Sequence, residues 1–179
     1  KDLTQQVSFY GMGLDIADIN NDQLQDIFVL DMASNDNFRA KTLMASMSTD
    51  KFNYLTKTAG FQYQYMFNSL QLNLGNDHYS NISQLTSMAS SDWSWSVLLS
   101  DYNNDGLKDV FITNGYRKYA LDNDFQNKVY KTKVKYKGNI PNNIKQQLYD
   151  EMPSESLSNL MYKNEGNLNF KEVGSNWGL

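Results

Sequence analysis

The segment "FYGMGLDIADINNDQLQDIFVLDM" (residues 9–32) is the most informative part of the sequence, because a second copy of it follows later in the chain. It aligns without gaps to "DWSWSVLLSDYNNDGLKDVFITNG" (92–115). Repetition of this kind indicates two copies of one structural unit. The identical positions are Asp18, Asn20, Asn21, Asp22, Leu24, Asp26 and Phe28 in the first copy, and Asp101, Asn103, Asn104, Asp105, Leu107, Asp109 and Phe111 in the second.

A second repeated segment follows each copy. "NLGNDHYSNI" (73–82) aligns with "NEGNLNFKEV" (164–173), so an Asn, a Gly, a second Asn, an aromatic and an aliphatic residue match in order. The chain therefore divides into two equivalent units, residues 1–91 and 92–179. Each unit has an acidic loop segment followed by a glycine-turn segment.

Each unit is expected to form four short antiparallel strands. Apolar stretches (13–17 and 94–100) precede the acidic loops, and "DIFVL" (26–30) and "DVFIT" (109–113) follow them, which predicts hairpins with the acidic loop at the tip. In the later segments, apolar residues flank Asn and Gly, which supply the positive φ of tight turns. Four-stranded units repeated along a chain are typical of β-propeller blades. We expect a mainly β fold with helical insertions, made of two four-stranded antiparallel blades.

A long insertion separates the two hairpins of each unit. In residues 33–69, Phe52, Leu55 and Ala59 fall near helical spacing, with Asp50 as a cap and Gly60 as a stop, which predicts one or two helices. In residues 116–159, "PNNIKQQLYDEM" (141–152) predicts another helix. Asp122, Asn123 and Asp124 either form a further polar site or cap a helix.

Composition excludes several classes of protein. The 179 residues carry a net charge of -4 and contain no cysteine. An acidic chain gives no supporting field for nucleic acid, so the basic cluster is expected to be a solvated strand or helix face. The absence of cysteine removes disulfides and thiolate chemistry, and no apolar run is long enough to span a bilayer. The cluster comprises Lys128, Tyr130, Lys131, Lys133, Lys135, Tyr136 and Lys137.

The acidic loops, residues 18–26 and 101–109, have the composition of calcium sites. Ca²⁺ takes six to eight oxygen ligands, and a tight loop can deliver them from alternate residues. Three carboxylates within nine residues repel one another unless a cation neutralises them, and Mg²⁺ fits less well because it keeps its waters and demands octahedral geometry. The predicted ligands are the side chains of Asp18, Asn20, Asp22 and Asp26 with the carbonyl of Leu24, and those of Asp101, Asn103, Asp105 and Asp109 with the carbonyl of Leu107.

The loops have two other possible interpretations. An EF-hand-type loop needs an acidic residue at its twelfth position, but Val29 and Ile112 stand there, inside the following strands. A metal-free hairpin rich in Asx turns is the alternative, because Asp and Asn favour turns in any case.

The pattern D-x-N-x-D-G-x-x-D between two strands resembles the calcium loop of FG-GAP or VCBS repeats, the blades of integrin-α-like propellers. The resemblance covers nearly the whole chain and is closest to bacterial extracytoplasmic proteins that carry these repeats ahead of an ASPIC/UnbV domain. It implies calcium loops on one face and long connections on the opposite, ligand-binding face. Gln23 departs from the family glycine and costs roughly 1–2 kcal/mol in a left-handed conformation. The first site is therefore expected to bind calcium more weakly, or to recruit Asp15 or water.

The resemblance implies a calcium-stabilised binding or scaffold module in an extracytoplasmic setting: secreted, cell-surface or periplasmic. The insertions would recognise a partner protein or a glycan. The alternative function is part of a lyase-like, polysaccharide-active enzyme, which would need a basic and acidic cluster in the central cleft, with Lys or Tyr from the insertions. The single histidine, His78, is not expected to be catalytic, because no base and nucleophile are assembled around it. Trp93 and Trp95 are expected on one strand face, packing between blades or stacking on a sugar. Two blades cannot close a ring, so the chain is expected to be a piece of a longer propeller or to bury its open faces on a partner.

Overall fold

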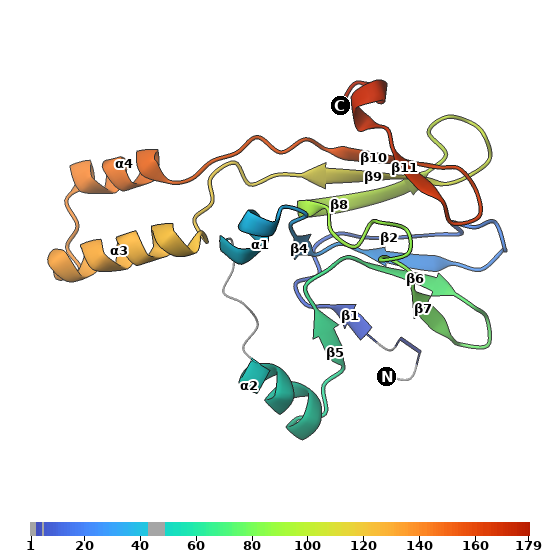
Figure 1. Cartoon of the computed structure of the whole chain (residues 1–179), viewed down its shortest axis with the longest axis horizontal. Coiled ribbons are helices and arrows are strands. Elements are labelled where there is room, and N and C mark those ends of the chain that lie inside the picture. Colours follow the sequence, from blue (N-terminus) through green and yellow to red (C-terminus); the bar gives the residue numbers. More distant parts are fainter. Residues whose placement is uncertain (1–2, 5, 43–48) are drawn as a thin grey trace.

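The computed structural model describes residues 3–4, 6–42 and 49–179, and the chain is mainly β-structure (Figure 1). The first unit forms a four-stranded antiparallel sheet in the order β2 (Leu14–Ala17), β3 (Asp26–Val29), β6 (Ser69–Asn73) and β7 (Tyr79–Asn81). This is the order in which the four strands occur in the sequence. The turn between β6 and β7 has positive φ at Gly75, Asn76 and Asp77, as its composition predicts.

The second unit forms a sheet with one strand more than expected. Its own strands are β8 (Asp92–Ser100), β9 (Asp109–Asn114), β10 (Leu160–Asn164) and β11 (Phe170–Glu172). A fifth strand, β4 (Met32–Ala33), pairs with the start of β8. The chain leaving β3 stays extended here because β8 is nine residues long and offers free backbone groups along this edge. The four strands of the second unit are thus joined by a strand of the first unit, which the sequence did not predict.

A third, small sheet was not predicted. Its strands, β1 (Gln6–Ser8) and β5 (Tyr63–Tyr65), pair in parallel. β5 belongs to "FQYQYMF" (61–67), where aromatic residues alternate with other residues as in a strand. The rings of Tyr65 and Phe67 stack with their centroids 5.6 Å apart.

The insertions contain helices, as expected. In the first insertion, α1 (Asn37–Thr42) and α2 (Thr49–Asn53) are followed by a π-helical turn (Tyr54–Thr58). Asp50 lies inside α2 rather than at its cap, whereas Gly60 has the positive φ of a helix stop. The insertion in which one or two helices were predicted, residues 33–69, lies partly outside the described residues.

In the second insertion, α3 (Asn123–Lys135) and α4 (Asn142–Glu151) form a hairpin that projects from the sheets like an arm (Figure 1). The side chain of Asp122 caps α3 by accepting from the N–H of Phe125, so its capping role is confirmed. A 3₁₀-helix (Gly174–Trp177) follows β11. Among the helices in the described part of the chain, none is long and apolar enough to cross a bilayer.

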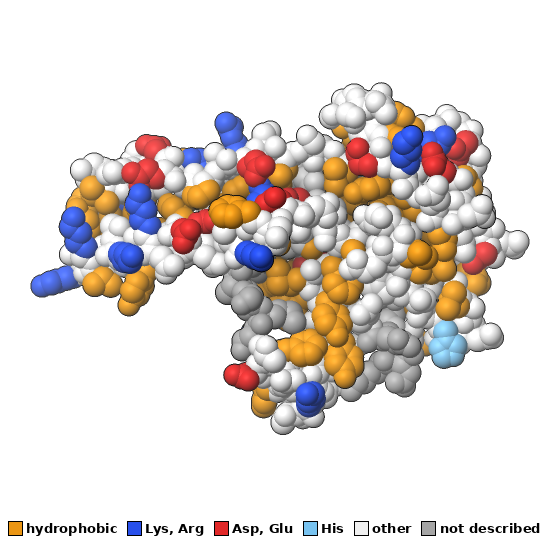
Figure 2. Space-filling view, in the orientation of Figure 1, with side chains coloured by type: hydrophobic (Ala, Val, Ile, Leu, Met, Phe, Trp, Pro, Cys, Tyr) orange, Lys and Arg blue, Asp and Glu red, His pale blue; other side chains and the backbone are white. Residues whose placement is uncertain are grey.

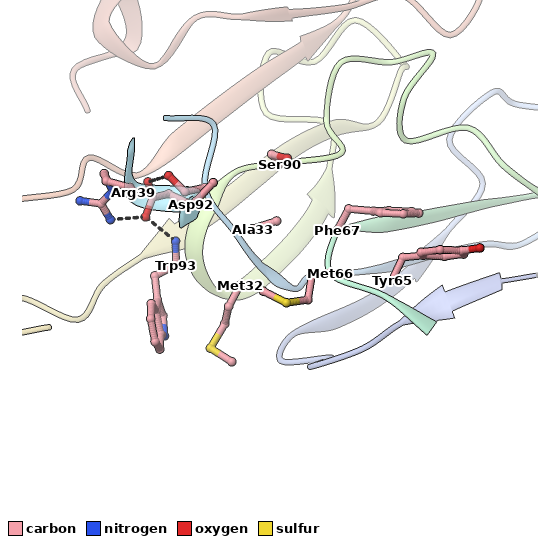
Figure 3. A pocket seen from close by; sticks show the side chains of 11 residues that line it. Met32, Ala33, Arg39, Tyr65, Met66, Phe67, Ser90, Asp92 and Trp93 are labelled. Carbon is pink, nitrogen blue, oxygen red and sulfur yellow. Dashed lines mark hydrogen bonds and ion pairs between the residues drawn. The ribbon is translucent and has the colours of Figure 1, made fainter. Parts of the chain in front are cut away.

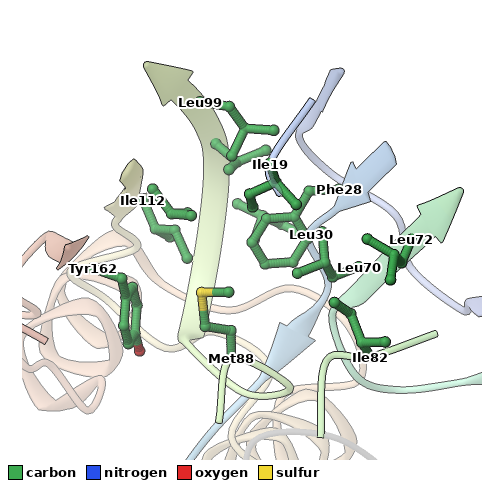
Figure 4. Packing of buried hydrophobic residues seen from close by; sticks show 12 residues of the cluster. Ile19, Phe28, Leu30, Leu70, Leu72, Ile82, Met88, Leu99, Ile112 and Tyr162 are labelled. Atoms are coloured by element: carbon green, nitrogen blue, oxygen red, sulfur yellow. The ribbon is translucent and has the colours of Figure 1, made fainter. Parts of the chain in front are cut away.

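The two large sheets pack face to face around one apolar core (Figure 4). The N–H of Leu99 on β8 also donates to the Asp15 carboxylate on β2, at 2.7 Å. A side chain at Gly13 would collide with the backbone of Trp95 and Ser96, so this glycine permits the close approach of the two sheets. The core residues are Ile19, Phe28, Leu30, Leu70, Leu72, Ile82 and Met88 from the first unit, and Val97, Leu99, Val110, Ile112 and Tyr162 from the second.

Trp93 and Trp95 do not share one face of β8. The register of β8 and β9 shifts between Ser94 and Ser96, and this bulge reorients the strand. Trp93 is 5% exposed and packs against Tyr119, whereas Trp95 is 44% exposed. The expectation of a shared face is wrong because a bulge breaks the period of two.

Candidate metal-binding loops

The side chains of the second acidic loop turn inward onto its own backbone. The two oxygens of Asp101 accept from the N–H groups of Asp105 and Gly106, at 3.1 and 2.8 Å. Asn103 accepts from the N–H of Asp105 at 3.0 Å, and Asp105 accepts from that of Leu107 at 3.0 Å. The backbone therefore brings oxygens of the first, third and fifth loop positions together.

The first loop repeats this network at the equivalent positions. Asp18 accepts from the N–H groups of Asp22 and Gln23, at 3.0 and 2.8 Å. Asn20 accepts from Asp22, and Asp22 accepts from Leu24. In both loops the amide of the third residue also donates to the carboxylate of the fifth, at 2.8 Å. The two loops thus have the same local structure despite Gln23.

The ninth positions, Asp26 and Asp109, have a different environment. Both are completely buried. Asp109 accepts from the N–H groups of Tyr102 and Asn164, at 3.1 and 2.8 Å, and so joins the loop to β10. Asp26 makes the equivalent bonds, to Ile19 and Asn73. Each of these carboxylates fixes the loop to the third strand of its own unit, β6 or β10.

Electrostatics differ between the loop positions. Burial raises the pKa of Asp26, and the charges of Asp22 and Asp18 add to the rise, while the two backbone N–H groups oppose it. The N–H of Leu107 and the amide of Asn103 hold the pKa of Asp105 below its ordinary value. Asp105 is therefore ionised at neutral pH, close to other carboxylates that a cation would neutralise.

The oxygen donors of each loop are of the type that a hard cation binds, but only some of the ligands that it needs converge. Two carboxylates and one amide oxygen converge in each loop, and oxygen donors of this type suit Ca²⁺. Within residues 3–4, 6–42 and 49–179, no three acidic, histidine or cysteine side chains are grouped so that they could hold a metal ion. The ninth-position aspartates already bind backbone amides, and ligation by the carbonyls of Leu24 and Leu107 stays a prediction.

The two loops lie side by side at one end of the molecule, and the helical insertions lie at the other (Figure 1). The side-chain amide of Asn21 donates to the carbonyl of Gly106 at 3.0 Å, and that of Asn164 donates to the carbonyl of Ile19 at 2.9 Å. Asp15 lies on β2 and bonds to Leu99 rather than entering the first loop. The suggestion that Asp15 assists the first site is not supported by this arrangement.

At the opposite end, an apolar pocket of about 420 Å³ opens between the first insertion and β8 (Figure 3). Met32, Tyr65, Phe67 and Trp93 contribute most of its apolar character, and Arg39 and Asp92 lie at one side. A pocket of this size, with few polar groups, is suited to a small ligand or a single bound side chain.

Arg39 links three elements at this end of the molecule, and no local sequence pattern predicts this role. Its guanidinium pairs with Asp92 at 2.6 Å and with Glu155, and it donates to the Tyr119 hydroxyl at 2.7 Å. Burial raises the pKa of Tyr119, although the Arg39 charge opposes this. These contacts join α1, β8 and the base of the second insertion. The partners are 53, 80 and 116 residues away in the chain, so no local pattern could have revealed the cluster.

The lysines of the second insertion lie on the projecting arm (Figure 2). Lys128, Lys131 and Lys135 share one side of α3 with Asp124 and line a shallow depression. Lys128 pairs with Glu151 of α4. The basic cluster is thus an exposed helix face, one of the two forms expected from the sequence.

Comparisons with protein-family models, with curated proteins and with solved structures gave no significant match to this chain. The function is therefore argued from the residues and their geometry.

Proposed function

We propose that this chain is a calcium-stabilised β-propeller module for binding or scaffolding, in an extracytoplasmic bacterial protein similar to FG-GAP or VCBS repeat proteins. Its two large sheets would be two adjacent blades. The observation that carries the proposal is the doubled loop. Two copies of an oxygen-rich turn, with the same internal hydrogen bonds, lie side by side at the end opposite both long insertions.

Calcium would have a structural role in this proposal. Each loop concentrates carboxylates whose mutual repulsion a dication relieves, and a cation that binds only the folded chain stabilises it. Loops of modest affinity fill where calcium is abundant, which favours the cell surface or periplasm. The residues that would hold the ion are the first, third and fifth of each loop, with the ninth supporting the turn from below.

Recognition would belong to the opposite end. Binding residues are commonly carried by loops on a rigid scaffold, and both insertions project from this end (Figure 1). The apolar pocket and the basic arm offer two chemically distinct surfaces there, which a partner protein or a glycan could use.

Excision of the arm tests whether calcium binding and ligand recognition lie at opposite ends of the molecule. Lys118 and Ser154 pair at the base of the arm, so residues 120–152 can be replaced by a short Gly/Ser linker with little strain on the sheet. On an array of neutral and acidic glycans, the parent chain should bind and the excised chain should not. Both should show the same rise in melting temperature with calcium. Equal glycan binding by the two chains would contradict a recognition role for the arm.

A further inference from the structure

The outer faces of the two sheets carry exposed apolar side chains. On the first sheet, Leu14 and Ile16 are 58% and 50% exposed, and both point away from the second sheet. The N-terminal strand β1 covers part of this face, where Gln71 donates to the carbonyl of Gln6. Leu14 and Ile16 lie beyond this cover.

The residues of this exposed face align with residues that are buried in the second unit. In the alignment of the two units, Leu14 and Ile16 correspond to Val97 and Leu99, which are buried against the first sheet. Ile27 and Val29 likewise correspond to Val110 and Ile112, both completely buried. The outer face of the first sheet therefore has the chemistry of the face that the second sheet uses to bind the first.

The residues on the outer face of the second sheet align with residues that are buried on the inner face of the first sheet. Tyr102 is 40% exposed and packs edge-to-face on Phe111, with the ring centroids 6.4 Å apart. These two residues correspond to Ile19 and Phe28, which are buried on the inner face of the first sheet. Leu98, 48% exposed, lies on the same outer face. This face has the chemistry of the surface that receives the second sheet.

We propose that the two outer faces are complementary, and that copies of this chain associate head to tail through them. The second sheet of one copy would receive the first sheet of the next, so that the interface inside each copy is repeated between copies. The contact is heterologous, and repetition of the same rotation closes a ring or extends a stack. The proposal rests on the assignment of the sheets as adjacent blades, but not on calcium binding or ligand recognition.

The hydrogen bonds between the two sheets of one copy indicate which hydrogen bonds could form between two copies. Asn104 is the equivalent of Asn21, so its amide could donate to the carbonyl of Gln23 across the new interface. Asn73 is the equivalent of Asn164, and its amide would exchange its present bond to the Tyr79 hydroxyl for one to the carbonyl of Tyr102. The bond from Leu99 to Asp15 has no counterpart, because Leu98 stands in the position of Asp15. Association between copies should therefore be weaker than the packing inside each copy.

Sedimentation velocity on three variants tests the proposal. Ile16→Asp places a charge on the first outer face and Leu98→Asp on the second, while Leu85→Asp, at an exposed position in the turn after β7, is the matched control. The parent chain and Leu85→Asp should associate as concentration rises from micromolar to millimolar. Each face variant should stay monomeric. An equimolar mixture of the two face variants should form a dimer of twice the monomer mass, because one intact face remains on each partner.

A parent chain that stays monomeric throughout would overturn the proposal. So would association of the parent chain combined with a mixture that remains monomeric, since that result indicates a different interface. Calcium-dependent melting, measured on the same samples, separates this outcome from failure of the proposed function. A monomer that calcium stabilises overturns the assembly alone, and an assembling chain without a calcium response overturns the calcium role alone.

Discussion

Gln23 and Gly106 occupy the same position in the two acidic loops, and both have left-handed backbone conformations, with φ of 70° and 88°. The hydrogen bonds around them are equivalent, so the loop geometry requires this conformation whichever residue is present. A side chain here is held at a cost that glycine avoids.

We therefore expect Gln23→Gly to stabilise the fold by about 1 kcal/mol, and Gly106→Gln to destabilise it by a similar amount. Urea unfolding of both variants beside the parent chain measures the two effects. Gln23→Gly should also raise the calcium affinity of the first loop. A loss of stability in Gln23→Gly would mean that the Gln23 side chain makes a contact that outweighs its backbone strain.

Replacing Asp105 and replacing Asp109 should destabilise the chain with different dependence on calcium. Asp109→Ala leaves two buried backbone N–H groups without an acceptor and should cost roughly 2–5 kcal/mol with or without calcium. Asp105→Ala should lower the melting temperature mainly when calcium is present. Melting curves in excess calcium and in chelator separate the two effects. Asp22→Ala and Asp26→Ala form the matched pair in the first loop, and the same losses for both members of a pair in chelator would contradict the assignment.

Arg39→Ala should destabilise the end that carries the insertions. It leaves the partly buried Asp92 without its charged partner, and the loss should approach the roughly 3–5 kcal/mol of a broken buried pair at most. Arg39→Lys should restore only part of the loss, because one ammonium cannot pair with Asp92 and Glu155 and also bond to Tyr119 in the same geometry. Hydrogen exchange should quicken in α1 and at the start of β8. The exposed Arg117→Ala is the control, and an equal effect there would show that charge alone is responsible.

Tyr162 predicts a loss of stability at alkaline pH. Burial, and then the Glu172 charge, raise its pKa above the ordinary value. A phenol whose pKa is raised on folding contributes stability that is complete below the unfolded pKa of about 10 and is lost as pH rises through the folded pKa. Tyr162→Phe should make the melting temperature fall less steeply above pH 10. Parallel slopes for the two proteins would remove Tyr162 as a cause.

Repetition explains why much of the fold could be predicted. The alignment of residues 9–32 with 92–115 indicated the hairpins with acidic loops, and the glycine-turn segments indicated the other turns, because these signals are local. β4 and β5 were missed since each depends on a partner strand distant in sequence. Trp95 was misplaced because a bulge leaves no mark in the sequence. Within the site, metal binding by the alternate loop residues stays a prediction, and the burial of Asp26 and Asp109 arises from strands that only the tertiary fold brings together.

Calorimetric titration of the chain with calcium distinguishes metal-binding loops from metal-free turns. We expect saturation near two ions per chain, with the second loop filling at lower calcium because Gly106 adopts its conformation without strain. The Asp105→Ala variant should lose one of the two binding events and keep the other. Absence of binding heat, together with identical melting temperatures in calcium and in chelator, would show that both loops are metal-free turns and would contradict the account.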